Sequence, residues 1–257
     1  MRLHHPRRDP IQSGMEDDMK LEGKRIVVLG GTSGIGLATA QAAARAGAQV
    51  VVASSTKRRV QEALTTLPPG AEGHAVDLAR QEQLAGFFAR CDRFDHLVFT
   101  AGERLQLAPL ETMDLAVARR FFELRYWSAL AAANEAAPRI RPGGSIVLTS
   151  GTAMLRPQRG WALAASICGA VESLTRALAI ELAPIRVNVV VPGIVRTELW
   201  SSLSETDRAA MYRQAGATLP VGRVGEAEDI AEAYLYLIGN GYTTGQSLVV
   251  DGGAVLI

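Results

Sequence analysis

The chain has 257 residues, of which 48% are hydrophobic and 5% aromatic, and its formal net charge at pH 7 is +1. This length suffices for the core of one α/β domain, and the charge provides no basic field for nucleic acid. No apolar run approaches the ~20 residues that cross a bilayer. Cys91 and Cys168 are far apart and outside any C-x-x-C pattern. This pattern predicts neither disulfides nor a metal site and fits a cytoplasmic protein.

Residues 1–20 differ in composition from the rest of the chain. They are basic, contain proline and show no hydrophobic periodicity, which predicts a disordered tail. They also lack the apolar core of a signal peptide. We therefore expect a tail over 1–20 and a single folded domain over 21–257.

The folded region opens with a β-branched run over 25–29, a glycine-rich turn and an apolar-periodic segment. This is the pattern of a strand, a tight loop and a helix. Glycine lets the backbone approach a phosphate, whose charge then lies on the free N–H groups of the helix N-terminus. The candidate contacts in this turn are Gly30, Thr32, Ser33, Gly34, Ile35 and Gly36.

Strands and helices alternate along the rest of the chain. The further predicted strands cover 49–53, 73–76, 96–100, 145–149, 186–191 and 248–251. The further predicted helices cover 57–66, 80–91, 114–137, 161–182 and 229–238. This alternation predicts an α/β fold with a doubly wound, seven-stranded parallel sheet and helices on both of its faces.

Several motifs, in this order, resemble those of the short-chain dehydrogenase/reductase family from about residue 20 to 257. The glycines at 30, 34 and 36 resemble its cofactor loop, and 77–78 resembles its adenine contact. The run 100–102 resembles the end of its Asn-Asn-Ala-Gly segment, and 192–197 resembles the loop that holds the nicotinamide carboxamide. The resemblance implies a Rossmann-type domain, a nicotinamide cofactor and a homo-oligomer, expected to be a tetramer. It adds the cofactor contacts Asp77, Leu78, Ala101, Gly102, Pro192, Gly193, Ile194 and Thr197.

The residues after the second predicted strand favour NADP(H) over NAD(H). Proteins that bind NAD place an Asp or Glu about 20 residues past the glycines, whereas the 2′-phosphate of NADP needs cations or hydroxyl groups. Here that position carries Ser54, Ser55, Lys57 and Arg58, with no carboxylate. The alternative is that Lys57 and Arg58 only solvate the start of a helix.

The resemblance also implies a catalytic Asn, Ser, Tyr and Lys, and the aligned positions differ at all four. They carry Arg125, Gly151, Ala164 and Cys168. In the family the Tyr donates a proton as hydride arrives, and the Lys lowers the pKa of that Tyr and holds the nicotinamide ribose. Ordinary carbonyl reduction is therefore not expected.

Two side chains are tentative substitutes for this set. The guanidinium of Arg125 could hold the ribose, or it could form a structural salt bridge with a carboxylate such as Glu123. The hydroxyl of Ser150 could bind a ligand, or it could cap the end of a strand. A small buried cysteine is the preferred interpretation of Cys168, rather than a nucleophile.

These observations leave two main hypotheses. In the first, the chain is a noncatalytic, NADP(H)-bound module or a partner of an active relative. In the second, it is an atypical oxidoreductase that handles protons with Arg125, Ser150 or the substrate itself. A third possibility, an interaction protein that binds no nucleotide, is disfavoured because the glycine turn is intact. The expected ligands are the cofactor and a small molecule, and neither nucleic acid nor a membrane is expected as a partner.

Overall fold

The computed structural model describes residues 21–103, 105 and 107–257; the predicted tail over 1–20 lies outside these residues. All seven predicted strands form one parallel sheet in the order β3-β2-β1-β4-β5-β6-β7. The doubly wound, seven-stranded fold is therefore confirmed. The strands are β1 (Arg25–Leu29), β2 (Gln49–Ser54), β3 (Glu72–Ala75), β4 (Phe94–Phe99), β5 (Ile140–Thr149), β6 (Arg186–Pro192) and β7 (Ser247–Val250).

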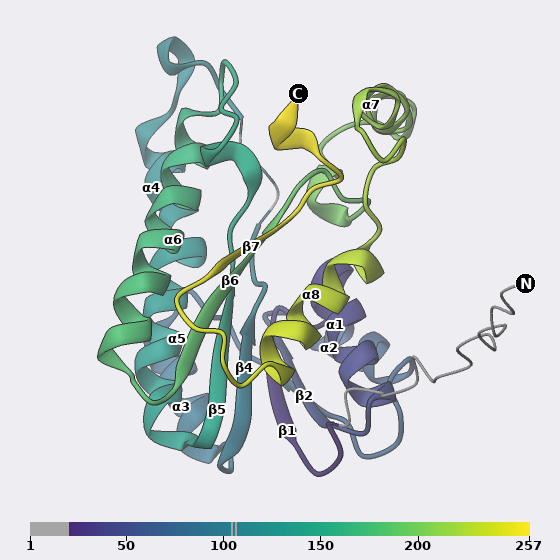
Figure 1. The fold of residues 1–257 in the computed structure, drawn as a ribbon. Helices are drawn as coiled ribbons and strands as arrows, with labels where there is room; N and C mark the ends of the chain where they lie inside the picture. The colour runs from purple at the N-terminus through teal and green to yellow at the C-terminus, as the bar shows by residue number, and fades with distance from the viewer. Residues whose placement is uncertain (1–20, 104, 106) are drawn as a thin grey trace, which may run out of the picture.

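Helices cover both faces of this sheet (Figure 1). One layer holds α1, α2 and α8, and the other holds α3, α5 and α6. The helices are α1 (Gly34–Arg45), α2 (Lys57–Leu64), α3 (Gln81–Arg90), α4 (Leu115–Phe122), α5 (Ser128–Ala136), α6 (Ala162–Glu181), α7 (Glu205–Thr218) and α8 (Ala227–Gly239).

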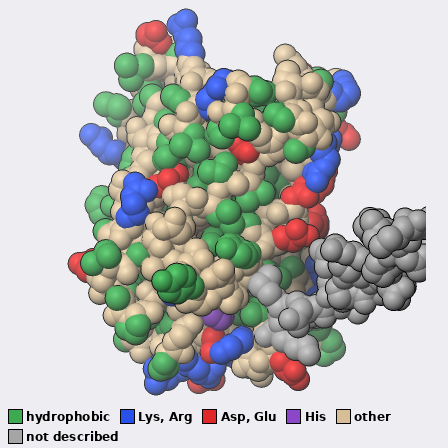
Figure 2. All heavy atoms as spheres, viewed as in Figure 1, with side chains coloured by type: hydrophobic (Ala, Val, Ile, Leu, Met, Phe, Trp, Pro, Cys, Tyr) green, Lys and Arg blue, Asp and Glu red, His purple; other side chains and the backbone are tan. Residues whose placement is uncertain are grey.

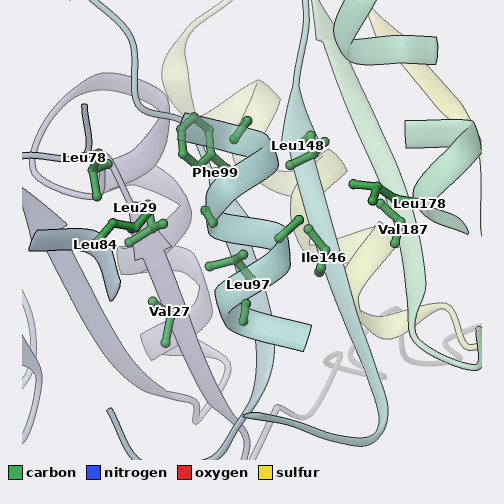
Figure 3. Close-up of a cluster of buried hydrophobic side chains, with 14 of the residues drawn as sticks. Val27, Leu29, Leu78, Leu84, Leu97, Phe99, Ile146, Leu148, Leu178 and Val187 are labelled. Carbon is green, nitrogen blue, oxygen red and sulfur yellow. The ribbon is translucent and has the colours of Figure 1, made fainter. Parts of the chain in front are cut away.

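Alternation along the strands divides the core into two layers. In β1, Val27 and Leu29 belong to the cluster beneath α3, α5 and α6, whereas Ile26 and Val28 belong to the cluster beneath α1 and α8. Successive strand residues point to opposite faces, so a strand that is buried on both sides consists almost entirely of apolar residues. Figure 3 shows side chains of the first cluster, contributed by several neighbouring strands.

The predicted helix over 114–137 is interrupted. It consists of α4, a π-helical turn at Glu123–Trp127 and α5, followed by a short 3-10 turn at Ala137–Arg139. A π-turn inserts an extra residue, shifts the faces of the helix and often occurs at functional sites. It carries Arg125, one of the residues singled out from the sequence.

Helix α6 is the one described helix that is long and apolar enough to cross a membrane, with a mean hydropathy of 1.4. Its buried residues include Ile167, Val171 and Leu178, which belong to the core cluster on one face of the sheet. The expectation that no apolar run approaches the length of a membrane span is therefore wrong for α6, whose buried residues also give it the packing of a core helix.

Helix α7 was not predicted from the sequence. It is largely exposed, and it anchors through Tyr212, which forms a small cluster with Leu219 and Val224. Ile194 and Trp200, from the segment after β6, pack against the same cluster. Helix α7 therefore supports a segment that lines the candidate site.

Candidate functional site

A cavity of about 530 Å³ lies at the carboxyl ends of the parallel strands. Its walls come from the β1–α1 turn, the residues that follow β2 to β6, and α6. In open α/β sheets this end, near the point where the strand order reverses, is the usual ligand crevice. The order β2-β1-β4 places that reversal between β1 and β4.

The glycine turn is shaped for a close approach of the backbone. Gly30 has φ +87°, and a Cβ there would lie 2.6 Å from the backbone nitrogen of Ala101. A Cβ at Gly36 would lie 2.2 Å from the carbonyl oxygen of Gly30 and 2.4 Å from Oγ1 of Thr100. Larger residues would therefore displace the turn from the end of β4.

The N-terminus of α1 is open to an anion. Its N-cap, Ser33, makes no side-chain capping hydrogen bond, and its first turn contains no acidic residue. The unpaired N–H groups and the helix dipole at this position favour a negatively charged ligand. These features fit a phosphate group.

Most of the predicted cofactor contacts line this one cavity. Thr197, after β6, lies against the turn: a Cβ at Gly34 would be 3.3 Å from its Cγ2. The predicted contacts that line the cavity are Gly30, Thr32, Ser33, Gly34, Ile35, Gly36, Ser54, Ser55, Asp77, Leu78, Ala101, Gly102, Pro192, Gly193, Ile194 and Thr197.

The structure does not bring Lys57 and Arg58 into the described wall of this cavity. Arg58 is exposed and pairs with Glu62 on its own helix. The next residue, Arg59, lines the cavity beside Ser54 and Ser55, and it pairs with Glu198 at 2.9 Å. Arg59 belongs to the same basic run as Lys57 and Arg58. Which of these three side chains reaches the cavity depends on where α2 begins and in which direction it runs.

The four residues that the family resemblance aligns with a catalytic set all lie at the cavity. Arg125, Gly151, Ala164 and Cys168 all line it, although they come from the π-turn, the segment after β5 and α6. A Cβ at Gly151 would lie 3.4 Å from Sγ of Cys168, an ordinary van der Waals distance. The positions that the alignment selected therefore share one wall.

Arg125 pairs with Glu103, not with Glu123. Nε of Arg125 lies 3.3 Å from Oε2 of Glu103, and Nη2 of Arg125 donates a hydrogen bond to the backbone oxygen of Glu103. The guanidinium also lies 4.7 Å from the ring centre of Phe121 and packs against Gly102. Of the two alternatives for Arg125, the structure therefore shows the salt bridge with a carboxylate, and that carboxylate is Glu103.

Burial shifts the pKa values of both members of this pair. It raises the pKa of the Glu103 carboxyl above its usual value, which the charge of Arg125 only partly opposes. It lowers the pKa of the Arg125 guanidinium, which Glu103 opposes in turn. Glu103 was not predicted from the sequence, although it directly follows the 100–102 run that resembles the family. An acidic residue at that position was the one feature of the sequence that could have indicated it.

Ser150 and Cys168 are engaged with each other. Oγ of Ser150 donates to the backbone oxygen of Cys168 at 3.1 Å and lies 3.5 Å from Oε1 of Glu172. Burial raises the pKa of the Cys168 thiol. The thiol is therefore protonated near neutral pH, which argues against a nucleophile, although Cys168 is half-buried and not fully buried as expected.

Comparison with known proteins identifies the family of the chain. The family model described as "Enoyl-(Acyl carrier protein) reductase" matches residues 30–255. The chain is 38% identical to "Short-chain dehydrogenase/reductase ucsE" of Acremonium sp., over 92% of this chain and 97% of that protein. The chain belongs to the short-chain dehydrogenase/reductase family.

Solved structures of this family share the fold. One described as "Crystal structure of a small-chain dehydrogenase in complex with NADPH" has a TM-score of 0.82 and 38% identity, covering 91% of this chain and 99% of that chain. "Structure of MalC Reductase/Diels-Alderase from Malbranchea aurantiaca" has a TM-score of 0.85 and 32% identity, covering 93% and 99%. The chain is thus an oxidoreductase by family membership.

Among the described residues of this short-chain dehydrogenase/reductase, no group of three or more His, Cys, Asp or Glu side chains is arranged to hold a metal ion.

Proposed function

We propose that the chain is an NADP(H)-dependent oxidoreductase that handles protons without the Tyr, Lys, Ser and Asn set of its family. The observation that carries this proposal is the convergence of Arg125, Gly151, Ala164 and Cys168 on one wall of the cavity. None of these four can act as the family's tyrosine acid, whereas the close backbone contacts of the glycine turn fit a bound cofactor.

The residues of the cavity fit a dinucleotide with a 2′-phosphate. The glycine turn and the N-terminus of α1 would hold the pyrophosphate, and Asp77 with Leu78 would flank the adenine. Ser54, Ser55 and Arg59 would hold the 2′-phosphate, since a guanidinium and hydroxyl groups suit that anion. When bound, the cofactor supplies or accepts a hydride. A similar structure, at 38% identity, contains NADPH.

The competing function is a noncatalytic module that binds NADP(H) without transferring hydride. It explains the altered positions equally well, but it gives no role to the buried Glu103–Arg125 pair on the cavity wall. The Glu103–Arg125 pair therefore favours a catalytic function over a noncatalytic one. The Malbranchea relative described as a reductase and Diels-Alderase shows that one family member is credited with two kinds of reaction.

NADPH should bind at least about 10-fold more tightly than NADH, because one added charge-assisted contact contributes on the order of 1.5–3 kcal/mol. Ser55→Asp should reverse this preference, since a carboxylate repels the 2′-phosphate and accepts hydrogen bonds from the free ribose. Titration of both cofactors by fluorescence measures the two affinities. Ser173→Asp, at an exposed position on α6, serves as the control. Equal affinities in the unmodified protein would refute the cofactor assignment.

We also propose a homo-oligomer, expected to be a tetramer. Large apolar side chains are exposed on α4, the π-turn and α6, including Leu115 (63%), Trp127 (52%) and Ile180 (82%). Figure 2 shows hydrophobic side chains scattered among charged ones on one face of the molecule. Light scattering at micromolar concentration should give a multiple of 27.4 kDa. A monomer would mean that these side chains are not interface residues.

A further inference from the structure

The Glu103–Arg125 pair is close but incompletely bonded. Oε2 of Glu103 and Nε of Arg125 are both buried, and neither has a hydrogen-bond partner in the described part of the chain. Their separation of 3.3 Å is that of an ion pair, but the two groups are not aligned for a hydrogen bond. A purely structural pair would be expected to satisfy both atoms.

The position of Glu103 also distinguishes it from the other carboxylates near the site. Its side chain lines the cavity and is 34% exposed; because Oε2 is buried, a ligand would meet the carboxyl group at Oε1. Glu172 is buried and accepts a hydrogen bond from Ser247 at 2.8 Å, and Glu198 is bound to Arg59. Asp77 accepts from the backbone nitrogen of Ala79 at the other end of the cavity. Glu103 is therefore the acid best placed to serve a ligand beside Ala101, Arg125 and Ser150.

We propose that Glu103 is the proton donor of the reaction and that Arg125 positions it and balances the charge it acquires. This inference rests on the proposed oxidoreductase function and names the group that takes over the tyrosine's role. It favours a carbonyl compound as acceptor, because a developing alkoxide needs one proton. Burial keeps the carboxyl protonated at a higher pH than usual, which suits a general acid.

The step balances in charge and protons. A hydride, which bound NADPH would supply, would add to the carbonyl carbon. The C=O π bond breaks, and its electron pair takes the proton from the carboxyl group of Glu103, which gives an alcohol. Glu103 becomes a carboxylate, and the guanidinium of Arg125, 3.3 Å away, stabilises its charge. Water then returns a proton to Glu103 through the open part of the cavity.

The other candidate groups are less suitable. Oγ of Ser150 already donates to the backbone of Cys168, and burial raises the pKa of the Cys168 thiol. Arg125 stays charged near neutral pH and is a poor proton donor. The contacts of Arg125 with Glu103, Phe121 and Gly102 suit it to positioning instead.

The first test measures protonation without turnover. Calorimetry in two buffers of different ionisation enthalpy counts the protons released when NADP⁺ or NADPH binds. These two ligands carry the same phosphates, and the positive nicotinamide ring of NADP⁺ should lower the pKa of a nearby protonated carboxyl, so NADP⁺ should release more protons than NADPH. Glu103→Gln should abolish the difference. Glu111→Gln, an exposed carboxylate paired with Arg159, should preserve it.

The second test measures NADPH oxidation with 2,3-butanedione, an activated dicarbonyl. The rate should fall as the pH rises through the pKa of Glu103, because the protonated form is the active one. Glu103→Gln should lower the rate about 100-fold and remove that pH dependence, since a positioned acid contributes ~100- to 10,000-fold. Glu103→Asp should retain the pH dependence at a reduced rate. Thermal unfolding of each variant checks that the fold is retained.

The outcomes separate the two proposals. If Glu103→Gln keeps the rate and the pH profile of the unmodified protein, or keeps the difference in proton release, the role of Glu103 is refuted and the oxidoreductase function stands. If the unmodified protein binds NADPH but oxidises none with 2,3-butanedione, the oxidoreductase function itself is refuted. A loss of rate in Glu111→Gln as large as in Glu103→Gln would also refute a specific role for Glu103.

Discussion

Simple ketones should be reduced at least ~100-fold more slowly by this chain than by a family member that carries the Asn, Ser, Tyr and Lys set. Glu103 can replace the proton transfer, but the substrate oxygen still lacks the hydroxyl groups that steady it. Gly151 and Ala164 offer only backbone and methyl groups at two of the four positions. The contributions of catalytic groups that act as a unit are not additive, so one acid does not restore the rate that the four groups give together.

A panel of simple ketones, followed by NADPH absorbance, measures this deficit. The matched comparison is a relative with the complete set, assayed at the same pH and cofactor concentration. Brisk turnover of simple ketones by the unmodified protein would contradict the expected deficit. Single substitutions at Glu103, Ser150, Arg125 and Cys168 would then identify the group responsible.

Restoring the four residues should create measurable ketone reduction. The variant combines Arg125→Asn, Gly151→Ser, Ala164→Tyr and Cys168→Lys, and we expect a gain of at least ~100-fold over the unmodified chain. The structure permits these changes. A Cβ at Gly151 meets nothing closer than 3.4 Å, and Ala164 and Cys168 line the cavity, into which larger side chains can extend.

The control for this variant is the same combination without Ala164→Tyr. It lacks the tyrosine acid and also lacks Arg125, which pairs with Glu103, so it should remain slow. Thermal unfolding and NADPH titration check that both proteins fold and bind the cofactor. No gain in a folded, NADPH-binding variant would mean that the four positions are not aligned as the family resemblance implies.

The sheet could be predicted from the sequence because its physical signal is strong. Strands such as β1 and β2 are buried on both faces, so they contain uninterrupted runs of apolar, mostly β-branched residues. The glycine turn was equally clear, because close backbone contacts such as that of Gly36 with Gly30 allow no side chain. Local sequence carries both signals.

Features that depend on tertiary contacts were missed. Helix α7 is largely exposed, so its sequence lacks a regular apolar face. The π-turn that orients Arg125 cannot be recognised from amino-acid composition. Glu103, the partner of Arg125, is 22 residues away in the sequence. Arg59 reaches the cavity instead of Arg58 because of the direction in which α2 leaves β2. These pairings require the fold to be known.

One fluorescence experiment tests most directly whether this chain is an NADPH-dependent oxidoreductase. Protein is added to NADPH, and 2,3-butanedione is then added to the same sample. We expect the nicotinamide emission to rise when NADPH binds and to decay when hydride is transferred. The absence of a rise would contradict the cofactor site, and a rise that never decays would contradict the oxidoreductase function and identify the chain as an NADPH-binding module.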